Sequence, residues 1–319
     1  MATTTTEFTE EMIFAAARET AVLVDRSALG LLKATGDTRL DLIHRMSTQA
    51  VNGLKNGEGR ATVLTTDIGR IIDRLILYVT GESVYMLTSE NNSDAVARYL
   101  MRYVFFMDDF HLEDKSPNTA VLAVYGPQAG EKLSAAGIHF EEIPLHHWRP
   151  VEVGGKSAFL HRTDPVNEDG YFIICHLEDK TVICQHLIQN GIPLADEDTF
   201  EAIRIESGLP RFGRELTGDY IPLEAELWDD VSFHKGCYIG QEVIARMESR
   251  GQIAKKLVRL RPSALVAAGQ EITAGGKKVG VITSAAVGPD GVVALGYVKT
   301  AVLEQSLPLL SGSVPIIKM

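Results

Sequence analysis

The C-terminal part of the sequence constrains the fold most, because it consists almost entirely of short apolar stretches divided by tight turns. From about Gln252 onward, turns are predicted at Gly275-Gly276 and at Pro289-Asp290-Gly291, with Val-rich and Ile-rich stretches between them. Gly-Gly and Asp-Gly pairs supply the positive φ angles that hairpin turns require. Such a pattern is typical of a small antiparallel β-barrel or sandwich. We therefore expect a C-terminal β-barrel domain over residues 251–319.

Residues 1–250 instead alternate between strand-like and helix-like patterns. Apolar residues recur at helical spacing within residues 38–54, 91–106 and 196–209, which predicts a helix in each range. Residues 119–126 are an apolar run that predicts a strand. The whole range predicts an α+β body, and two subdomains within it would divide near residues 118–150. The expected architecture is α+β, with the barrel following the body.

The charge and cysteine content narrow the class of protein. The formal net charge is −11, and the one basic stretch, residues 250–261, alternates apolar and basic residues as a half-exposed strand does. A nucleic-acid partner is therefore not expected. No apolar run is long enough for a membrane span, and the N-terminus lacks signal-peptide and transit-peptide patterns. Three cysteines without a CxxC pair indicate a reducing compartment, and we expect a cytoplasmic protein.

The usual nucleotide, hydrolase and metalloprotease signatures are absent, and the nine histidines are scattered, so no metal site is expected. The stretch HKGCYIGQE at residues 234–242 remains. Cys237 follows Lys235 and precedes a predicted helix from Gln241 to Met247, and both a cation and a helix N-terminus stabilise a thiolate. Gly236 and Gly240 would let the loop bend. The alternative is a Gly-rich connection in which the cysteine is incidental.

Three further charged residues are candidates for a site. Arg204 and Glu206 end the predicted helix over residues 196–209, and a buried carboxylate there would accept N–H donors from a pterin or guanidine-like ring. Spacing alone leaves a surface Arg–Glu pair equally open. Asp73 interrupts an apolar strand, where an acid is either turned outward or buried with a partner.

These stretches together resemble a known family. KGCYIGQE matches the K-G-C-[FY]-x-G-Q-E signature of YgfZ-like proteins, folate-binding relatives of the glycine-cleavage T-protein. GRIIDRL, VYGPQA and RIESGLPRFGREL are similar to further segments of that superfamily, so the resemblance covers roughly residues 20–300. It implies body and barrel subdomains arranged as a ring around a tetrahydrofolate pocket.

The resemblance also assigns roles to residues of this chain. Cys237 would carry the iron–sulfur function of YgfZ-like proteins, with Lys235 and Asp73 as further catalytic residues. Glu206 would be the pterin-binding carboxylate, and the predicted folate-binding residues around it are Arg204, Tyr238, Gln241 and Glu242. The T-protein positions folate with an acidic pair, but here the second acidic position is Arg74. That departure counts against aminomethyl transfer.

The sequence thus predicts a protein that binds tetrahydrofolate or a one-carbon derivative and supports iron–sulfur cluster assembly or repair. Its partners would be folate and iron–sulfur proteins or their assembly factors. The alternative is a folate-dependent aminomethyltransferase or methyltransferase, and a third reading is a thiol-based redox or transfer enzyme without folate.

Overall fold

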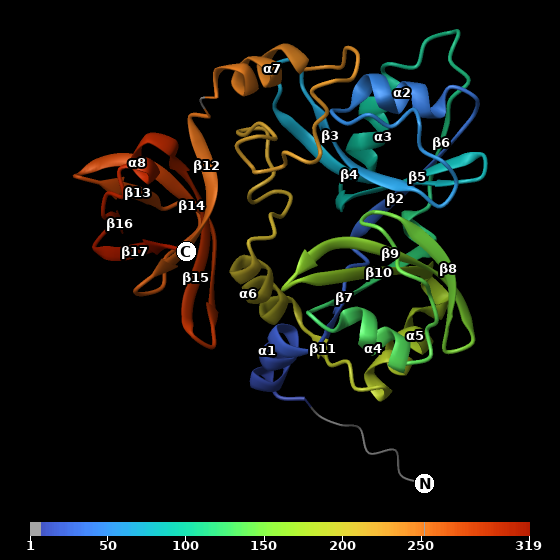
Figure 1. Ribbon diagram of the computed structural model, residues 1–319, viewed down its shortest axis with the longest axis horizontal. Helices are drawn as coiled ribbons and strands as arrows, with labels where there is room; N and C mark the ends of the chain where they lie inside the picture. Colours follow the sequence, from blue (N-terminus) through green and yellow to red (C-terminus); the bar gives the residue numbers. More distant parts are fainter. Residues whose placement is uncertain (1–7, 252) are drawn as a thin grey trace. The chain divides into compact units, whose positions relative to one another are not determined.

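The computed structural model describes residues 8–251 and 253–319 (Figure 1). Helices and strands alternate up to Ser207, and strands dominate from Lys255 onward. The chain forms two compact units, each built from separate segments. The first unit contains the residues up to Arg39 together with 53–60 and 76–200, and the second contains 40–52, 61–75 and 201–319.

A six-stranded sheet belongs entirely to the first unit. All its neighbouring strands are antiparallel except β1 and β11. Side chains of α4 (Ala129–Ala135) and α5 (Lys180–Gln189), such as Leu133 and Ile183, share one buried cluster with Leu122 of the sheet. Both helices therefore cover the same face. The strand order is β11 (Leu194–Ala195), β1 (Val22–Asp25), β7 (Thr119–Tyr125), β10 (Asp169–His176), β9 (Lys156–Val166), β8 (Trp148–Val153).

A five-stranded sheet includes β3 (Gly59–Thr65), β4 (Ile71–Thr80) and β5 (Ser83–Glu90), which are joined by turns at residues 67–68 and 81–82. Its strands β3 and β4 run through the boundary between the two units. Gly81, at a φ of 55°, lies in the tight turn that joins β4 to β5. The helix that follows β5 is α3 (Ser93–Met101). The strand order is β3 (Gly59–Thr65), β4 (Ile71–Thr80), β5 (Ser83–Glu90), β2 (Leu29–Thr35), β6 (His111–Asp114).

The helix predicted over residues 38–54 is shorter than expected, because α2 spans only Arg39–Met46. The next residues join β3 instead. Ser47 forms a bridge with Leu64, and the Thr48 amide donates to the Val63 carbonyl over 3.0 Å. The apolar spacing beyond Met46 therefore reflects burial against a strand and not a continuing helix.

The C-terminal residues of the second unit form a closed six-stranded barrel, with α8 (Thr300–Glu304) between β15 and β16 (Figure 1). Every strand pair in it is antiparallel. Leu260, Ile272 and Ile282 contribute to its buried core. The predicted α+β class with an antiparallel barrel is confirmed. In order around the barrel the strands are β12 (Lys255–Pro262), β15 (Gly291–Lys299), β14 (Lys277–Gly288), β13 (Glu271–Ala274), β16 (Leu309–Ser311), β17 (Val314–Lys318).

Two further helices of the second unit carry the candidate site. They are α6 (Glu197–Ser207), of which Glu201 onward belongs to this unit, and α7 (Gln241–Arg250). The first unit begins with α1 (Glu10–Glu19), which the sequence patterns did not predict. The domain boundary expected at residue 250 stays a prediction. No helix within residues 8–251 and 253–319 has the length and apolar character that crossing a membrane requires.

Candidate functional site

All eight residues that the sequence predicts for the site belong to the second unit. They come from four elements of the chain: β4, α6, the loop that precedes α7, and α7 itself. In chain order they are Asp73, Arg204, Glu206, Lys235, Cys237, Tyr238, Gln241 and Glu242.

Cys237 lies in the loop before α7 and its side chain is exposed. Gly236 is exposed as well, whereas Tyr238 is buried. The other two cysteines differ from it. Cys175 is buried in β10, where burial raises the pKa of its thiol to about 11, and burial also raises the pKa of the half-buried Cys184. Cys237 is therefore the thiol that a partner reaches most easily.

Lys235 fixes the loop on the N-terminal side of Cys237. Its Nζ donates to the backbone carbonyls of His44, Ser47 and Gln49 over 2.5, 2.8 and 2.8 Å. An ammonium group has three N–H donors, so these three carbonyls use all of them. Burial lowers the pKa of Lys235 to about 8. The ammonium thus binds the end of α2 and the residues after it, and the expected catalytic role of Lys235 stays a prediction.

The aromatic ring of Tyr238 lies next to the Lys235 ammonium group. The Lys235 Nζ lies 5.2 Å from the centroid of the Tyr238 ring, within the range of a cation–π interaction. The ring also packs in a buried cluster with Ile221, Leu223 and Ile244. Burial raises the pKa of the Tyr238 phenol to about 12. The buried ring therefore anchors the loop while its neighbour Cys237 remains outside.

A second anchor lies on the C-terminal side of Cys237. The Thr65 hydroxyl donates to the Ile239 carbonyl over 2.6 Å. Gly240 follows at a φ of 84°, and a Cβ at this position would lie 2.6 Å from the Thr66 carbonyl oxygen. Only glycine fits both the left-handed backbone and this close approach. A Cβ at Gly236 would meet nothing within 4 Å. Glycine is therefore required at position 240 but not at position 236.

Arg74, which stands at the second acidic position of the T-protein pattern, forms a third anchor. Its guanidinium donates to both carboxylate oxygens of Asp230, over 2.5 and 3.3 Å. The Thr48 hydroxyl donates to the Asp230 carbonyl over 2.6 Å, and the Gln49 amide donates to the Asp229 carbonyl over 2.7 Å. The segment just before the loop is therefore bound to β4 and to the residues after α2.

Asp73, beside Arg74 in β4, is fully buried. Its Oδ1 accepts a hydrogen bond from the Arg74 backbone amide over 2.8 Å. Of the two orientations that strand alternation left open, the inward one is observed. A buried carboxylate needs such partners, because burial without them costs several kcal/mol.

Arg204 lies at the centre of a buried charge cluster, with 1% of its surface exposed. Its guanidinium donates to the carboxylates of Glu201 and Glu215, and to the Ser284 hydroxyl over 2.6 Å. Ser284 in turn donates to Glu215 over 2.7 Å, and Arg211 donates to Glu201 over 3.0 Å. Burial raises the pKa of Glu201, but the charges and hydrogen bonds of Arg204 and Arg211 lower it overall. The cluster joins α6 to the barrel strand β14.

Glu206, two residues further along α6, is half-buried. Its backbone carbonyl accepts a hydrogen bond from Arg259 over 3.2 Å, which fixes this end of the helix against β12. A carboxylate can accept hydrogen bonds from the N–H donors of a pterin ring, and the guanidinium of Arg204 donates to acceptors of the protein itself. Gln241 is half-buried and Glu242 exposed in the first turn of α7. The roles of these residues toward folate stay predictions.

Sequence reasoning missed most of the groups that hold the loop. The carbonyls that bind Lys235 belong to the predicted helix over residues 38–54, and Asp230 stands in a plain WDD stretch. A signal was available for Asp230, since Arg74 in an otherwise apolar strand needs an acidic partner. No group of three or more His, Cys, Asp or Glu side chains suited to a metal ion occurs among the described residues.

Comparison with known proteins gives the family. The model described as the GCVT N-terminal domain matches residues 6–235. An aminomethyltransferase of Bacillus subtilis strain 168 is 30% identical over 288 residues, which are 86% of this chain and 78% of that protein. A putative chloroplastic transferase of Arabidopsis thaliana is also 30% identical over 288 residues, and the match covers 87% of this chain but 65% of the plant protein.

A solved structure supports the fold. The crystal structure of the glycine cleavage system aminomethyltransferase T from Bartonella henselae matches with a TM-score of 0.83 at 23% identity, over 96% of this chain and 86% of that one. The chain belongs to the GCVT family. The family match ends two residues before Cys237, so it does not include the exposed thiol.

Proposed function

We propose that this protein binds tetrahydrofolate or one of its one-carbon derivatives and supports iron–sulfur cluster assembly or repair through Cys237. The observation that carries the proposal is the display of this thiol. Cys237 is exposed between two anchors, the Lys235 ammonium on one side and the Thr65–Ile239 hydrogen bond on the other. A thiolate that reaches solvent from a fixed loop can ligate iron or attack a partner. The resemblance of this loop to that of YgfZ-like proteins implies the same role for Cys237.

The folate part of the proposal is supported by family membership and by Glu206. Aminomethyltransferases are among the relatives, and the half-buried Glu206 offers an acceptor that a pterin would need. When bound, folate would supply a one-carbon carrier, while this chain orients it. Three free cysteines suit a reducing compartment such as the cytoplasm.

Thiol reactivity is the first test. Alkylation near neutral pH followed by peptide mass mapping should label Cys237 first, Cys184 next and Cys175 last, because the first is exposed and the last is buried. Equal labelling of all three in the folded protein would count against a displayed thiol. Protection of Cys237 that appears only with tetrahydrofolate would instead locate the thiol beside bound folate.

The cellular test uses Cys237→Ala in cells that lack the native protein. This variant should keep its melting temperature, because one exposed small side chain contributes little packing energy, but should not restore iron–sulfur enzyme activity. Cys184→Ala is the matched control and should restore it fully. Full rescue by Cys237→Ala would rule out the thiol as the functional group.

Folate binding is tested by calorimetry with tetrahydrofolate. Glu206→Ala should bind more weakly by about 2–3 kcal/mol, which is tens- to a hundredfold in Kd, because one charged hydrogen-bond acceptor is lost. Glu304→Ala removes an exposed carboxylate and should bind as the unaltered protein does. Unchanged binding by Glu206→Ala would remove this residue from the site.

A second candidate function is folate-dependent aminomethyl or methyl transfer. The observation in its favour is Asp73, the first acid of the T-protein pair, which is retained and buried. Arg74 argues against it, because its guanidinium is paired with Asp230 where the T-protein has a second acid. Tetrahydrofolate-dependent turnover of glycine or dimethylglycine, lost in Asp73→Asn, would establish the transferase.

A further inference from the structure

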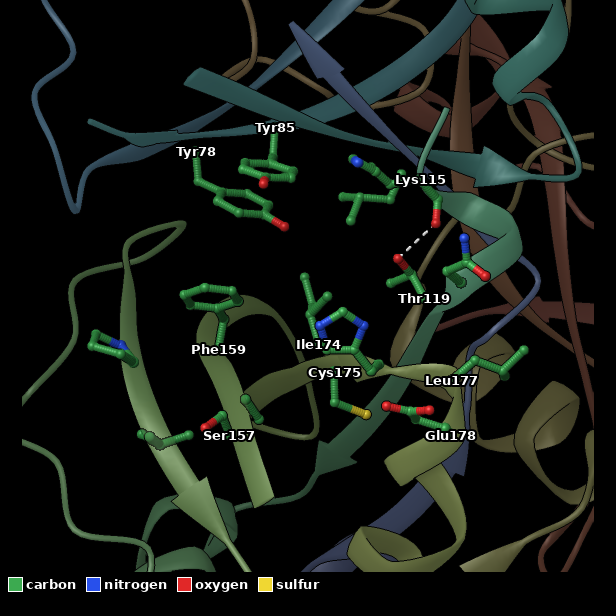
Figure 2. A pocket seen from close by; sticks show the side chains of 16 residues that line it. Tyr78, Tyr85, Lys115, Thr119, Ser157, Phe159, Ile174, Cys175, Leu177 and Glu178 are labelled. Atoms are coloured by element: carbon green, nitrogen blue, oxygen red, sulfur yellow. Dashed lines mark hydrogen bonds between the residues drawn. The ribbon is translucent and has the colours of Figure 1, made fainter. Parts of the chain in front are cut away.

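A cavity of about 890 Å³ lies in the first unit, between strands of its two sheets. None of the residues predicted for folate or for thiol chemistry lines it. Its volume falls within the range of about 300–1,000 Å³ that is usual for small-molecule sites. Figure 2 shows Tyr78 and Tyr85 on one side, Phe159 facing them, and Cys175 and Glu178 at the far end.

The aromatic side of the cavity is rigid. The rings of Tyr78 and Tyr85 stack with centroids 5.4 Å apart, and the Tyr78 hydroxyl points into the cavity (Figure 2). Phe159 packs edge-on against Trp148 with ring centroids 5.0 Å apart. The Trp148 Nε1 donates to the Val79 carbonyl over 2.9 Å, which ties the two sheets together. These rings are held in place before any ligand arrives, so binding would order few side chains.

Apolar surface remains exposed inside this concave wall. Phe159 keeps 38% of its surface exposed and Leu177 keeps 47%. Large apolar side chains that stay solvent-exposed in a concave site gain free energy when an apolar ligand covers them. The wall therefore favours a molecule with a flat aromatic ring.

The charged group that the cavity offers to a ligand is a carboxylate. Among the described lining residues, the ammonium and carboxylate groups belong to Lys115 and Glu178 alone. Lys115 is paired with Glu113. Glu178 makes no hydrogen bond or ion pair within the described chain, although its charge helps to raise the pKa of Lys156, whose ammonium pairs with Asp179. Figure 2 shows the Glu178 side chain at the end of the cavity opposite the tyrosines. Lys33 lies 6.0 Å from the Tyr85 ring but does not line the cavity.

We propose that this cavity binds a small organic cation that carries an aromatic ring. The ring lies against Phe159 and the edge of Tyr78, and the amine donates to the Glu178 carboxylate. Such a ligand gives the Glu178 carboxylate a charged hydrogen-bond donor and covers the exposed apolar surface at the same time. The proposal is independent of folate and of Cys237.

Tryptamine and indole-3-propionate test it, because they share one ring and carry opposite charges. Calorimetry should detect tryptamine binding, with indole-3-propionate weaker by about tenfold or more, since only the amine can donate a charged hydrogen bond to the Glu178 carboxylate. Glu178→Gln should abolish the difference between the probes. Phe159→Ala should weaken both probes. Glu141→Gln, an exposed carboxylate outside the cavity, should change neither.

The competing outcomes are distinct. Equal affinity for the two probes, or binding of tryptamine that neither Glu178→Gln nor Phe159→Ala changes, would overturn the proposal. Failure of tryptamine to bind would overturn it as well. Both variants replace exposed side chains, so an unchanged melting temperature verifies that each remains folded.

Discussion

Arg204, which is buried, and Lys235, which is half-buried, are two cations of the second unit that are stabilised in different ways. Arg204 contacts two carboxylates, Glu201 and Glu215, and the pair with Glu215 is almost wholly buried, at 1% and 0% exposed. Lys235 contacts no carboxylate in the described chain and donates to three backbone carbonyls instead. Arg204 is stabilised by carboxylates of opposite charge, whereas Lys235 is stabilised by the dipoles of backbone carbonyl groups.

The two cations differ in how readily they lose a proton. A guanidinium stays charged at all accessible pH values, so the Arg204 cluster is a permanent connection between α6 and the barrel. An ammonium loses its proton more readily, and burial has already lowered the pKa of Lys235 to about 8. The loop that displays Cys237 is therefore held by the weaker and more adjustable of the two arrangements.

The largest expected change in the free energy of unfolding comes from breaking the ionic cluster of Arg204. Arg204→Met should destabilise the protein by about 3–5 kcal/mol, because the Glu215 carboxylate would remain buried without an opposite charge. Denaturant unfolding measures the change. Lys278→Met, which breaks an exposed ion pair with Glu271, should stay within about 0.5 kcal/mol. A small effect of Arg204→Met would mean that the two carboxylates take up protons or water without cost.

Gly240→Ala addresses the backbone anchor of the loop. It should cost about 2–3 kcal/mol, because alanine disfavours the left-handed backbone and its Cβ would clash with the Thr66 carbonyl. Cys237 alkylation should change together with stability. Gly236→Ala is the matched control, where open space predicts almost no effect on either measurement. Equal effects of the two substitutions would contradict the close approach at Gly240.

Lys235→Met removes the ammonium group that donates to the three backbone carbonyls. It should destabilise the protein by about 2 kcal/mol, since three carbonyls lose their donor while a half-buried charge is also removed. Hydrogen exchange should rise at residues 44–49, and the Cys237 alkylation rate should shift. Lys277→Met, at an exposed lysine of the barrel, should alter neither. Unchanged exchange at residues 44–49 would show that the ammonium does not hold this segment.

The smallest effect is a pH dependence. Burial lowers the pKa of Lys235 to about 8 from the ordinary 10.5, so the unfolded chain binds more protons between these values and stability rises with pH there. The destabilisation by Lys235→Met should therefore be larger at about pH 9 than at about pH 7, by about 1 kcal/mol. The Arg204→Met destabilisation should not change. A smaller Lys235→Met effect at the higher pH would mean that the carbonyl acceptors outweigh burial.

The two cations also illustrate how far the sequence could be read. The barrel was predictable because its turn residues act locally, through the φ angles that Gly275 and Gly276 permit. The Arg204 cluster was visible in RIESGLPRFGREL, but spacing could not separate a surface pair from a buried one. The partners of Lys235 left no signal at all, because every residue has a carbonyl and only the three-dimensional fold selects which ones it meets.

The anchors of Cys237 also determine when its surroundings come into existence. Lys235 binds residues that precede it by 186–191 positions, and Ile239 binds Thr65 across 174 positions. Closing such long loops is slow and occurs only after the intervening chain has been synthesised. Until these contacts form, neither anchor holds the loop that contains Cys237. The fixed display of this thiol therefore depends on long-range folding within the second unit, so a partner that recognises the displayed thiol also distinguishes the folded unit from the unfolded chain.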